Sequence, residues 1–171
     1  MRKLIITRGP PGIGKTTIAN ALIAKLDKGY LLRLDETRTD LFQSYLTCAL
    51  KYENVVGEMF FGNSHTTNPS EWLSHFSNEK YEKLSVLLTG SLEDCLTGII
   101  RRKQPSHWTL PLDQIRIDYY DFYTKYKPIF RCMVDFPEIE VNNARTTNPN
   151  VVVEHILSVF GKSDNLKNTS D

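Results

Sequence analysis

The chain of 171 residues, with 40% hydrophobic and 24% charged side chains, has the composition of a folded domain with room for a substantial core. Lysine and arginine number 21 against 20 aspartate and glutamate, so the formal net charge of +1 excludes a global attraction to nucleic acid or membrane and leaves only a local basic patch. Cys48, Cys95 and Cys132 lack metal-ligand spacing, and we recognise no signal peptide or membrane-spanning apolar run, so we expect a reduced, cytoplasmic protein.

The first predicted strand, Leu4–Thr7, leads into the most informative segment of the chain. Residues 9–16 read Gly-Pro-Pro-Gly-Ile-Gly-Lys-Thr and match the phosphate-binding pattern G-x-x-x-x-G-K-[ST] completely. Apolar residues then recur at helical spacing over Thr16–Leu26, so the glycine loop stands between a strand and a helix. In this arrangement backbone N–H groups and a helix N-terminus converge on an anion, which predicts a site for a nucleoside triphosphate.

Two side chains of the glycine loop have specific predicted roles. We expect Lys15 to reach the β and γ phosphates of ATP, and the hydroxyl of Thr16 to hold Mg²⁺. ATP and Mg²⁺ are therefore the predicted cofactors. The predicted nucleotide-binding residues are Gly9, Pro10, Pro11, Gly12, Ile13, Gly14, Lys15, Thr16 and Thr17.

Beyond the loop, short apolar runs alternate with amphipathic segments. The further predicted strands are Tyr30–Leu34, Val55–Phe60, Ser85–Leu88 and Ile139–Val141, and the further predicted helices are Arg38–Leu50, Ser70–Phe76, Leu92–Arg102, Asp113–Tyr126 and Asn150–Phe160. This alternation predicts the α/β class, with a P-loop NTPase-type parallel five-stranded sheet sandwiched by helices and its ligands at the carboxyl ends of the strands. We expect one P-loop domain over residues 1–161 and a flexible polar tail over residues 162–171.

The signatures of two other classes of P-loop protein are missing. A GTPase would carry Asn-Lys-x-Asp after a later strand, whereas Asn78-Glu79-Lys80 lies in a polar helical segment and fails that pattern. A motor-type ATPase would end an apolar strand in Asp-Glu, whereas the third predicted strand has a single acid, Glu58, followed by apolar residues. The sequence therefore favours a kinase.

An acid follows the second predicted strand in the segment Leu34-Asp35-Glu36-Thr37-Arg38. We expect this strand to neighbour the glycine loop, which would place Asp35 near the γ phosphate. A carboxylate there can accept the proton of an attacking hydroxyl, and the same residue can cap the following helix. Arg38, one helical turn further on, can clamp a phosphate or carboxylate of the acceptor.

The chain resembles the kinase domain of phage-type 5′-hydroxyl polynucleotide kinases. The resemblance runs through residues 1–7, the glycine loop with Thr17, and Leu34–Arg38, and it resumes at Leu110-Pro-Leu-Asp-Gln-Ile-Arg116, which is similar to the segment closing that family's lid. It implies that Asp35 is the general base, that Arg38 contacts the phosphate of the acceptor, and that arginines of the lid contact the donor.

Further acceptor contacts are predicted after the third strand. Glu58 is a carboxylate near the end of an otherwise apolar strand, and such a group is costly to bury unless it is paired or bound to a metal or substrate. Asn63 and His65 lie in a polar loop at the same edge of the sheet. With Arg38, these residues form the candidate acceptor-binding set.

A helical lid is predicted around residues 101–110. The helix before it begins with a capping-box-like spacing of Ser91 and Asp94, and it ends in Arg101, Arg102 and Lys103. Cations at a helix C-terminus stabilise its dipole, and cations entering a lid can also neutralise the charge that develops on a transferring phosphoryl group. Arg101 and Arg102 are therefore candidate catalytic residues beside Lys15 and Asp35.

These residues support three hypotheses. The first is an ATP- and Mg²⁺-dependent kinase that phosphorylates the 5′-hydroxyl end of a polynucleotide, RNA or DNA. The alternative in the same class is a small-molecule kinase acting on a nucleoside, nucleotide, sugar or antibiotic, which the near-neutral net charge favours. The third is a regulatory ATPase or switch that binds a protein partner and has no acceptor. The predicted partners are ATP and a nucleic-acid end or small hydroxylated acceptor, with no membrane, and the oligomeric state stays open.

Overall fold

The structure, a computed structural model, describes residues 1–33, 39–59, 69–101 and 111–167. The strands are β1 (Arg2–Arg8), β2 (Gly29–Arg33), β3 (Asn54–Met59), β4 (Tyr81–Leu88) and β5 (Glu138–Val141). The helices are α1 (Lys15–Lys25), α2 (Thr39–Ala49), α3 (Pro69–Leu73), α4 (Leu92–Ile100), α5 (Leu112–Asp121), η1 (Phe122–Tyr126), α6 (Lys127–Met133) and α7 (Pro149–Lys167). None of the helices within these ranges is long and apolar enough to cross a membrane.

The strands form one parallel five-stranded sheet with the order β2-β3-β1-β4-β5, which confirms the predicted α/β class. The order corrects one expectation. The second strand does not neighbour the strand of the glycine loop, because β3 lies between them and β2 forms the edge of the sheet. The carboxyl end of β2 is therefore separated from the strand of the glycine loop by β3.

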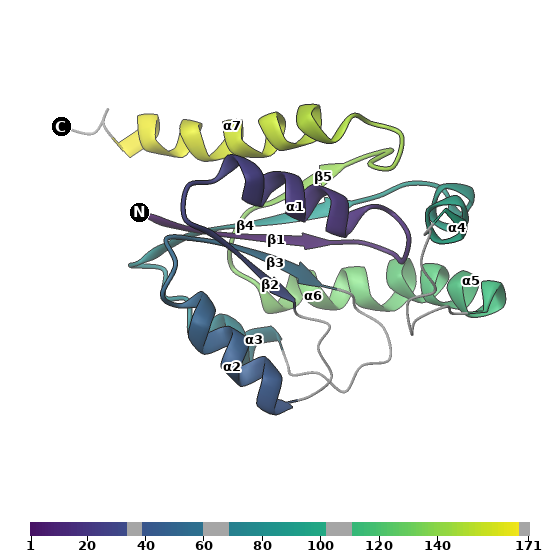
Figure 1. The fold of residues 1–171 in the computed structure, drawn as a ribbon, viewed down its shortest axis with the longest axis horizontal. Helices are drawn as coiled ribbons and strands as arrows, with labels where there is room; N and C mark the ends of the chain where they lie inside the picture. Colours follow the sequence, from purple (N-terminus) through teal and green to yellow (C-terminus); the bar gives the residue numbers. More distant parts are fainter. Residues whose placement is uncertain (34–38, 60–68, 102–110, 168–171) are drawn as a thin grey trace.

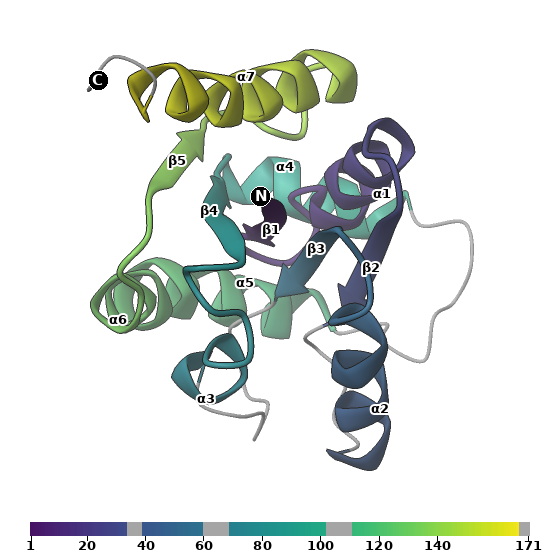
Figure 2. The ribbon, with the colours of Figure 1, turned by 90° about the vertical axis from the view of Figure 1, so that its left-hand side faces the viewer.

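Helices cover both faces of the sheet (Figures 1 and 2), as a parallel sheet requires. On one face, α1 and α7 bury a cluster that includes Ile18, Leu22 and Ile156 against the sheet. On the other face, α2, α3 and α6 bury a second cluster that includes Phe42, Trp72 and Phe130. The two clusters hold β1, the strand that carries the glycine loop, at the centre of the molecule.

Two helical segments differ from the prediction. The helix expected over 113–126 is α-helical only to Asp121, continues as a π-helix over Phe122–Tyr126, and leads directly into α6, which the sequence analysis missed. The last helix runs to Lys167 and not to Phe160, so the first part of the predicted polar tail is helical. A π-helical turn has no simple sequence signature, since it depends on how the flanking turns pack.

Candidate active site

The glycine loop joins β1 to α1, where the sequence placed it. Gly12 and Gly14 have φ angles of 78° and 108°, left-handed conformations that glycine adopts without strain. Gly14 is the N-cap of α1, and its carbonyl accepts the hydrogen bond of Ile18 N–H at 3.1 Å. The first N–H groups of α1 therefore face the loop, where the positive end of the helix dipole attracts an anion.

Lys15 is folded back over this loop. Its Nζ donates hydrogen bonds of 2.9 Å to the carbonyl oxygens of Gly9 and Pro10, and the residue is only 8% exposed. The ammonium is thus kept at the mouth of the loop, beside the N-terminus of α1. A cation in this position can meet the phosphates of a nucleotide, and this role of Lys15 stays a prediction.

The remaining loop residues divide between core and surface. Pro10, Pro11 and Ile13 are buried, and Ile13 belongs to the cluster beneath α1. The side chain of Thr17 is exposed. Ile13 therefore anchors the loop through its side chain, and only its backbone remains to serve a nucleotide.

The structure brings Thr16 and Glu58 together. The hydroxyl of Thr16 donates a 2.5 Å hydrogen bond to Oε1 of Glu58, which stands at the end of β3, next to β1. A hydroxyl and a carboxylate are hard oxygen donors of the kind that Mg²⁺ prefers, so this pair fits the predicted metal. Glu58 thus lies beside the predicted Mg²⁺ ligand, and its predicted contact with an acceptor stays a prediction. Within the described residues, no group of three or more His, Cys, Asp or Glu could hold a metal by itself.

Helix α4 packs directly on the glycine loop. A side chain at Gly98 would collide with the carbonyl oxygen of Gly12, and one at Gly12 would collide with that of Cys95. Burial raises the pKa of the Cys95 thiol to about 12, so this cysteine is a protonated core residue at neutral pH. The last turn of α4, which contains Gly98, therefore lies against the backbone of the glycine loop.

Arg101 is the C-cap of α4 and is exposed. The predicted capping box is present at the other end of this helix, where Asp94 N–H donates to the Ser91 hydroxyl at 3.1 Å and Ser91 N–H donates to the Asp94 carboxylate at 3.1 Å. Arg101 follows Gly98 by one turn, so it stands close to the loop contact. Its catalytic role stays a prediction.

Several predicted site residues lie outside the described residues. They are Asp35, Arg38, Asn63, His65 and Arg102. Their roles as base, acceptor ligands and lid cation stay predictions.

A buried ion pair beneath the loop was missed by the sequence analysis. Arg8, the residue before Gly9, places Nη2 2.6 Å from Oε2 of Glu138 at the start of β5, with the two side chains 1% and 10% exposed. Ser85 donates to the same carboxylate oxygen at 2.9 Å, and the guanidinium lies 4.2 Å from the ring centroid of Phe130. Burial lowers the pKa of Arg8, which the Glu138 carboxylate partly offsets. The sequence offered one signal, an arginine directly after the apolar run Leu4–Thr7.

Comparisons with known proteins agree with this geometry. A family model described as AAA domain matches residues 4–105, whereas a search of curated proteins gave no match. Among solved structures, shikimate kinase from Bacteroides thetaiotaomicron is 17% identical with a TM-score of 0.61, over 94% of this chain and 98% of that one. Deoxyadenosine kinase from M. mycoides, with products dCMP and dCDP bound, is 15% identical with a TM-score of 0.57, over 93% and 98%. Shikimate kinase from Acinetobacter baumannii, in complex with shikimate, is 20% identical with a TM-score of 0.57, over 100% and 97%.

The parallel sheet, the glycine loop and the lysine folded over it define a P-loop kinase fold, which these solved structures share. The family model covers more than half of the chain, so the protein belongs to this AAA-domain family of P-loop proteins.

Proposed function

We propose that the protein is an ATP- and Mg²⁺-dependent kinase that transfers the γ-phosphoryl group to a hydroxyl of a small acceptor molecule. The observation that carries the proposal is the hydrogen bond between Thr16 and Glu58, next to Lys15 on the same loop. A hydroxyl, a carboxylate and an ammonium at one helix N-terminus provide metal and phosphate ligands together.

The remaining predicted residues complete the reaction. The acceptor oxygen forms a bond to the γ phosphorus while the bond from that phosphorus to ADP breaks, and the Asp35 carboxylate takes the proton of the acceptor hydroxyl. Mg²⁺, when bound, neutralises negative charge on the β and γ phosphates. Lys15, Arg101 and Arg102 neutralise the charge that remains.

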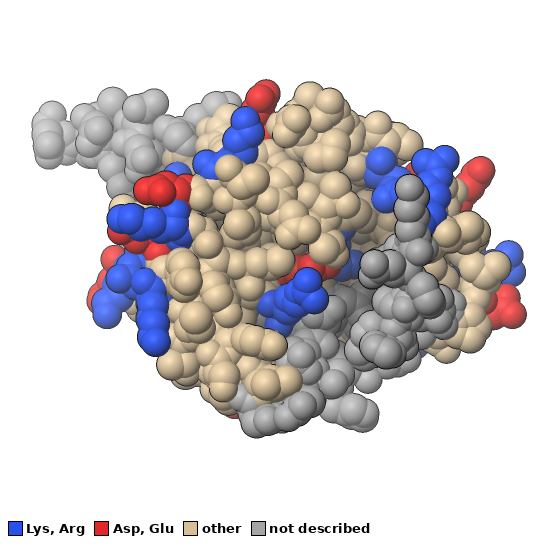
Figure 3. Space-filling view, in the orientation of Figure 1, with Lys and Arg blue, Asp and Glu red and all other residues tan. Residues whose placement is uncertain are grey.

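Two observations support a small acceptor. The formal net charge is +1, and cationic and anionic groups of the described residues lie interspersed on the face shown in Figure 3. The solved structures of similar fold are shikimate kinases and a deoxyadenosine kinase with deoxycytidine phosphates bound. By analogy of fold, a kinase of this shape accommodates acceptors of that size.

The second candidate acceptor is the 5′-hydroxyl end of RNA or DNA. The segments Leu34–Arg38 and Leu110–Arg116 favour it through their resemblance to polynucleotide kinases. In that case Arg38 would hold a phosphate of the strand. A regulatory switch without an acceptor is the least supported, because the third predicted strand lacks the Asp-Glu pair of a motor-type ATPase.

One screen separates these candidates. The protein is incubated with γ-labelled ATP and Mg²⁺ and with 5′-hydroxyl RNA, 5′-hydroxyl DNA, nucleosides, nucleotides and shikimate in turn. Label transferred to a small molecule supports the proposal, and label on an oligonucleotide supports the second candidate. Hydrolysis that depends only on a protein partner would support the switch.

The metal side of the proposal has its own test. We expect Glu58→Gln to raise the Mg²⁺ concentration needed for half-maximal activity by roughly tenfold or more, because outer ligands of a metal typically contribute that much to affinity. At saturating Mg²⁺ most of the turnover should return. The matched control is Glu53→Gln, which alters an exposed carboxylate just before β3 and should leave the Mg²⁺ requirement unchanged. An unchanged requirement in Glu58→Gln would remove Glu58 from the metal site.

A further inference from the structure

Arg33, the last residue of β2, has no role in the function proposed so far. In the parallel pairing of β2 with β3 it stands opposite Glu58, so both side chains leave the same face of the sheet. Two residues earlier, Leu31 packs against the cluster that contains Ile18 of α1, which identifies this face as the α1 side. Arg33 is therefore the neighbour of the carboxylate that binds the Thr16 hydroxyl.

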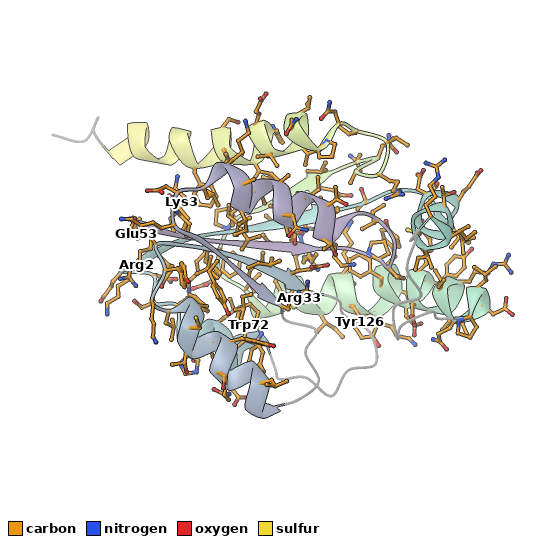
Figure 4. All side chains as sticks on the ribbon, in the orientation of Figure 1. Arg2, Lys3, Arg33, Glu53, Trp72 and Tyr126 are labelled. Atoms are coloured by element: carbon orange, nitrogen blue, oxygen red, sulfur yellow. The ribbon has the colours of Figure 1, made fainter. Side chains whose placement is uncertain are left out.

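The guanidinium of Arg33 is exposed and makes no hydrogen bond or ion pair with any residue in the described ranges. Arg2 and Arg8, in contrast, bind Leu50 and Glu138. Oε1 of Glu58 is occupied by Thr16. The donors of Arg33 consequently stand at the carboxyl edge of the sheet without a partner among these residues, where Figure 4 shows the side chain at the end of β2.

The position of Arg33 separates it from the donor phosphates. The glycine loop follows β1, and β3 lies between β1 and β2. Neighbouring strands are about 4.8 Å apart, so Arg33 starts roughly 10 Å from the strand that carries the loop, with Glu58 and Thr16 in between. It flanks the phosphate and metal ligands on the side away from the loop, which is where an acceptor must approach.

We propose that Arg33 binds an anionic group, a carboxylate or a phosphate, of the acceptor whose hydroxyl receives the phosphoryl group. This inference rests on the proposed kinase function and narrows its substrate to anionic small molecules. A planar guanidinium can grip either group with two parallel hydrogen bonds, which fixes the acceptor in orientation as well as in place.

The test compares acceptors that differ only in the anionic group: adenosine 3′-monophosphate against adenosine, and shikimate against methyl shikimate. For the wild-type chain we expect a higher kcat/KM with the anionic member of each pair than with its neutral member. Arg33→Gln should lower kcat/KM for that member by roughly ten- to hundredfold, mainly through KM, and leave the neutral member unchanged. Arg33→Lys should restore part of the loss, and the two pairs distinguish a phosphate from a carboxylate.

Two controls make the outcomes separable. Lys51→Gln removes an exposed positive charge just before β3, at the amino ends of the strands and away from Arg33. It should leave kcat/KM unchanged for both members of each pair. The Kd of ATP, measured by titration calorimetry, should be the same in Arg33→Gln and wild type. An equal loss on both members of a pair, or a weakened Kd for ATP, overturns the role of Arg33 while the kinase function stands. If wild type phosphorylates none of these acceptors and none in the wider screen, the kinase function fails and the inference falls with it.

Discussion

Replacing Lys15 with alanine is expected to lower kcat for phosphoryl transfer by roughly 10³-fold or more, because its ammonium lies on the glycine loop, where it can neutralise charge on the transferring phosphoryl group. The fold should survive. The ammonium donates hydrogen bonds to the loop carbonyls of Gly9 and Pro10, and Lys15 belongs to neither hydrophobic cluster. Initial rates of ADP formation with the acceptor found in the screen, together with circular dichroism, measure both effects.

Lys25→Ala is the matched control for this variant. It makes the same change on the same helix, in the last turn of α1, where the side chain is exposed and remote from the loop. It should keep wild-type rates. Near-wild-type turnover in a folded Lys15→Ala protein would refute the kinase function itself.

Gly98→Ala should lower the free energy of unfolding by about 2–4 kcal/mol and weaken ATP binding. At an unhindered helix position, the same change would stabilise the protein by up to about 1 kcal/mol, since alanine is the better helix former. The sign of the change in the free energy of unfolding therefore tests the contact between α4 and the glycine loop. The added Cβ would collide with the carbonyl oxygen of Gly12, so the helix and the loop would have to separate.

Thermal unfolding and the Kd of ATP check this prediction. Thr97→Ala, at the neighbouring and half-buried position of α4, should be close to neutral in both measurements. A Gly98→Ala protein more stable than wild type would show that the helix and the loop are not in register as described.

The parts of the fold that depend on local sequence patterns could be predicted. The glycine loop and its flanking elements follow from one uninterrupted motif, and alternating apolar runs located all five strands to within a few residues. The order of the strands was not predictable in the same way. Chain order favours pairing of consecutive strands but does not determine it, and β3, not β2, is the neighbour of β1.

The contacts that build the site join residues far apart in the chain. Thr16 and Glu58 are 42 residues apart, and their pairing depends on the register of β3 against β1. Gly98 offered a weak signal, since glycine is unfavourable inside an apolar helix and needs a packing reason. Sequence patterns report local periodicity, whereas these contacts follow from the tertiary arrangement.

The buried pair of Arg8 and Glu138 has a consequence for the order in which the parts of the sheet can fold during synthesis. The two residues are separated by 130 positions, so during synthesis the strand of the nucleotide loop emerges early and its counter-charge emerges late. Until β5 docks, closing the core would bury an unpaired guanidinium, which typically costs several kcal/mol. The segment that matches the family model, residues 4–105, lacks this counter-charge. The strand that leads into the glycine loop is therefore synthesised early, but the charge of its Arg8 is neutralised only after β5 has been synthesised and has docked.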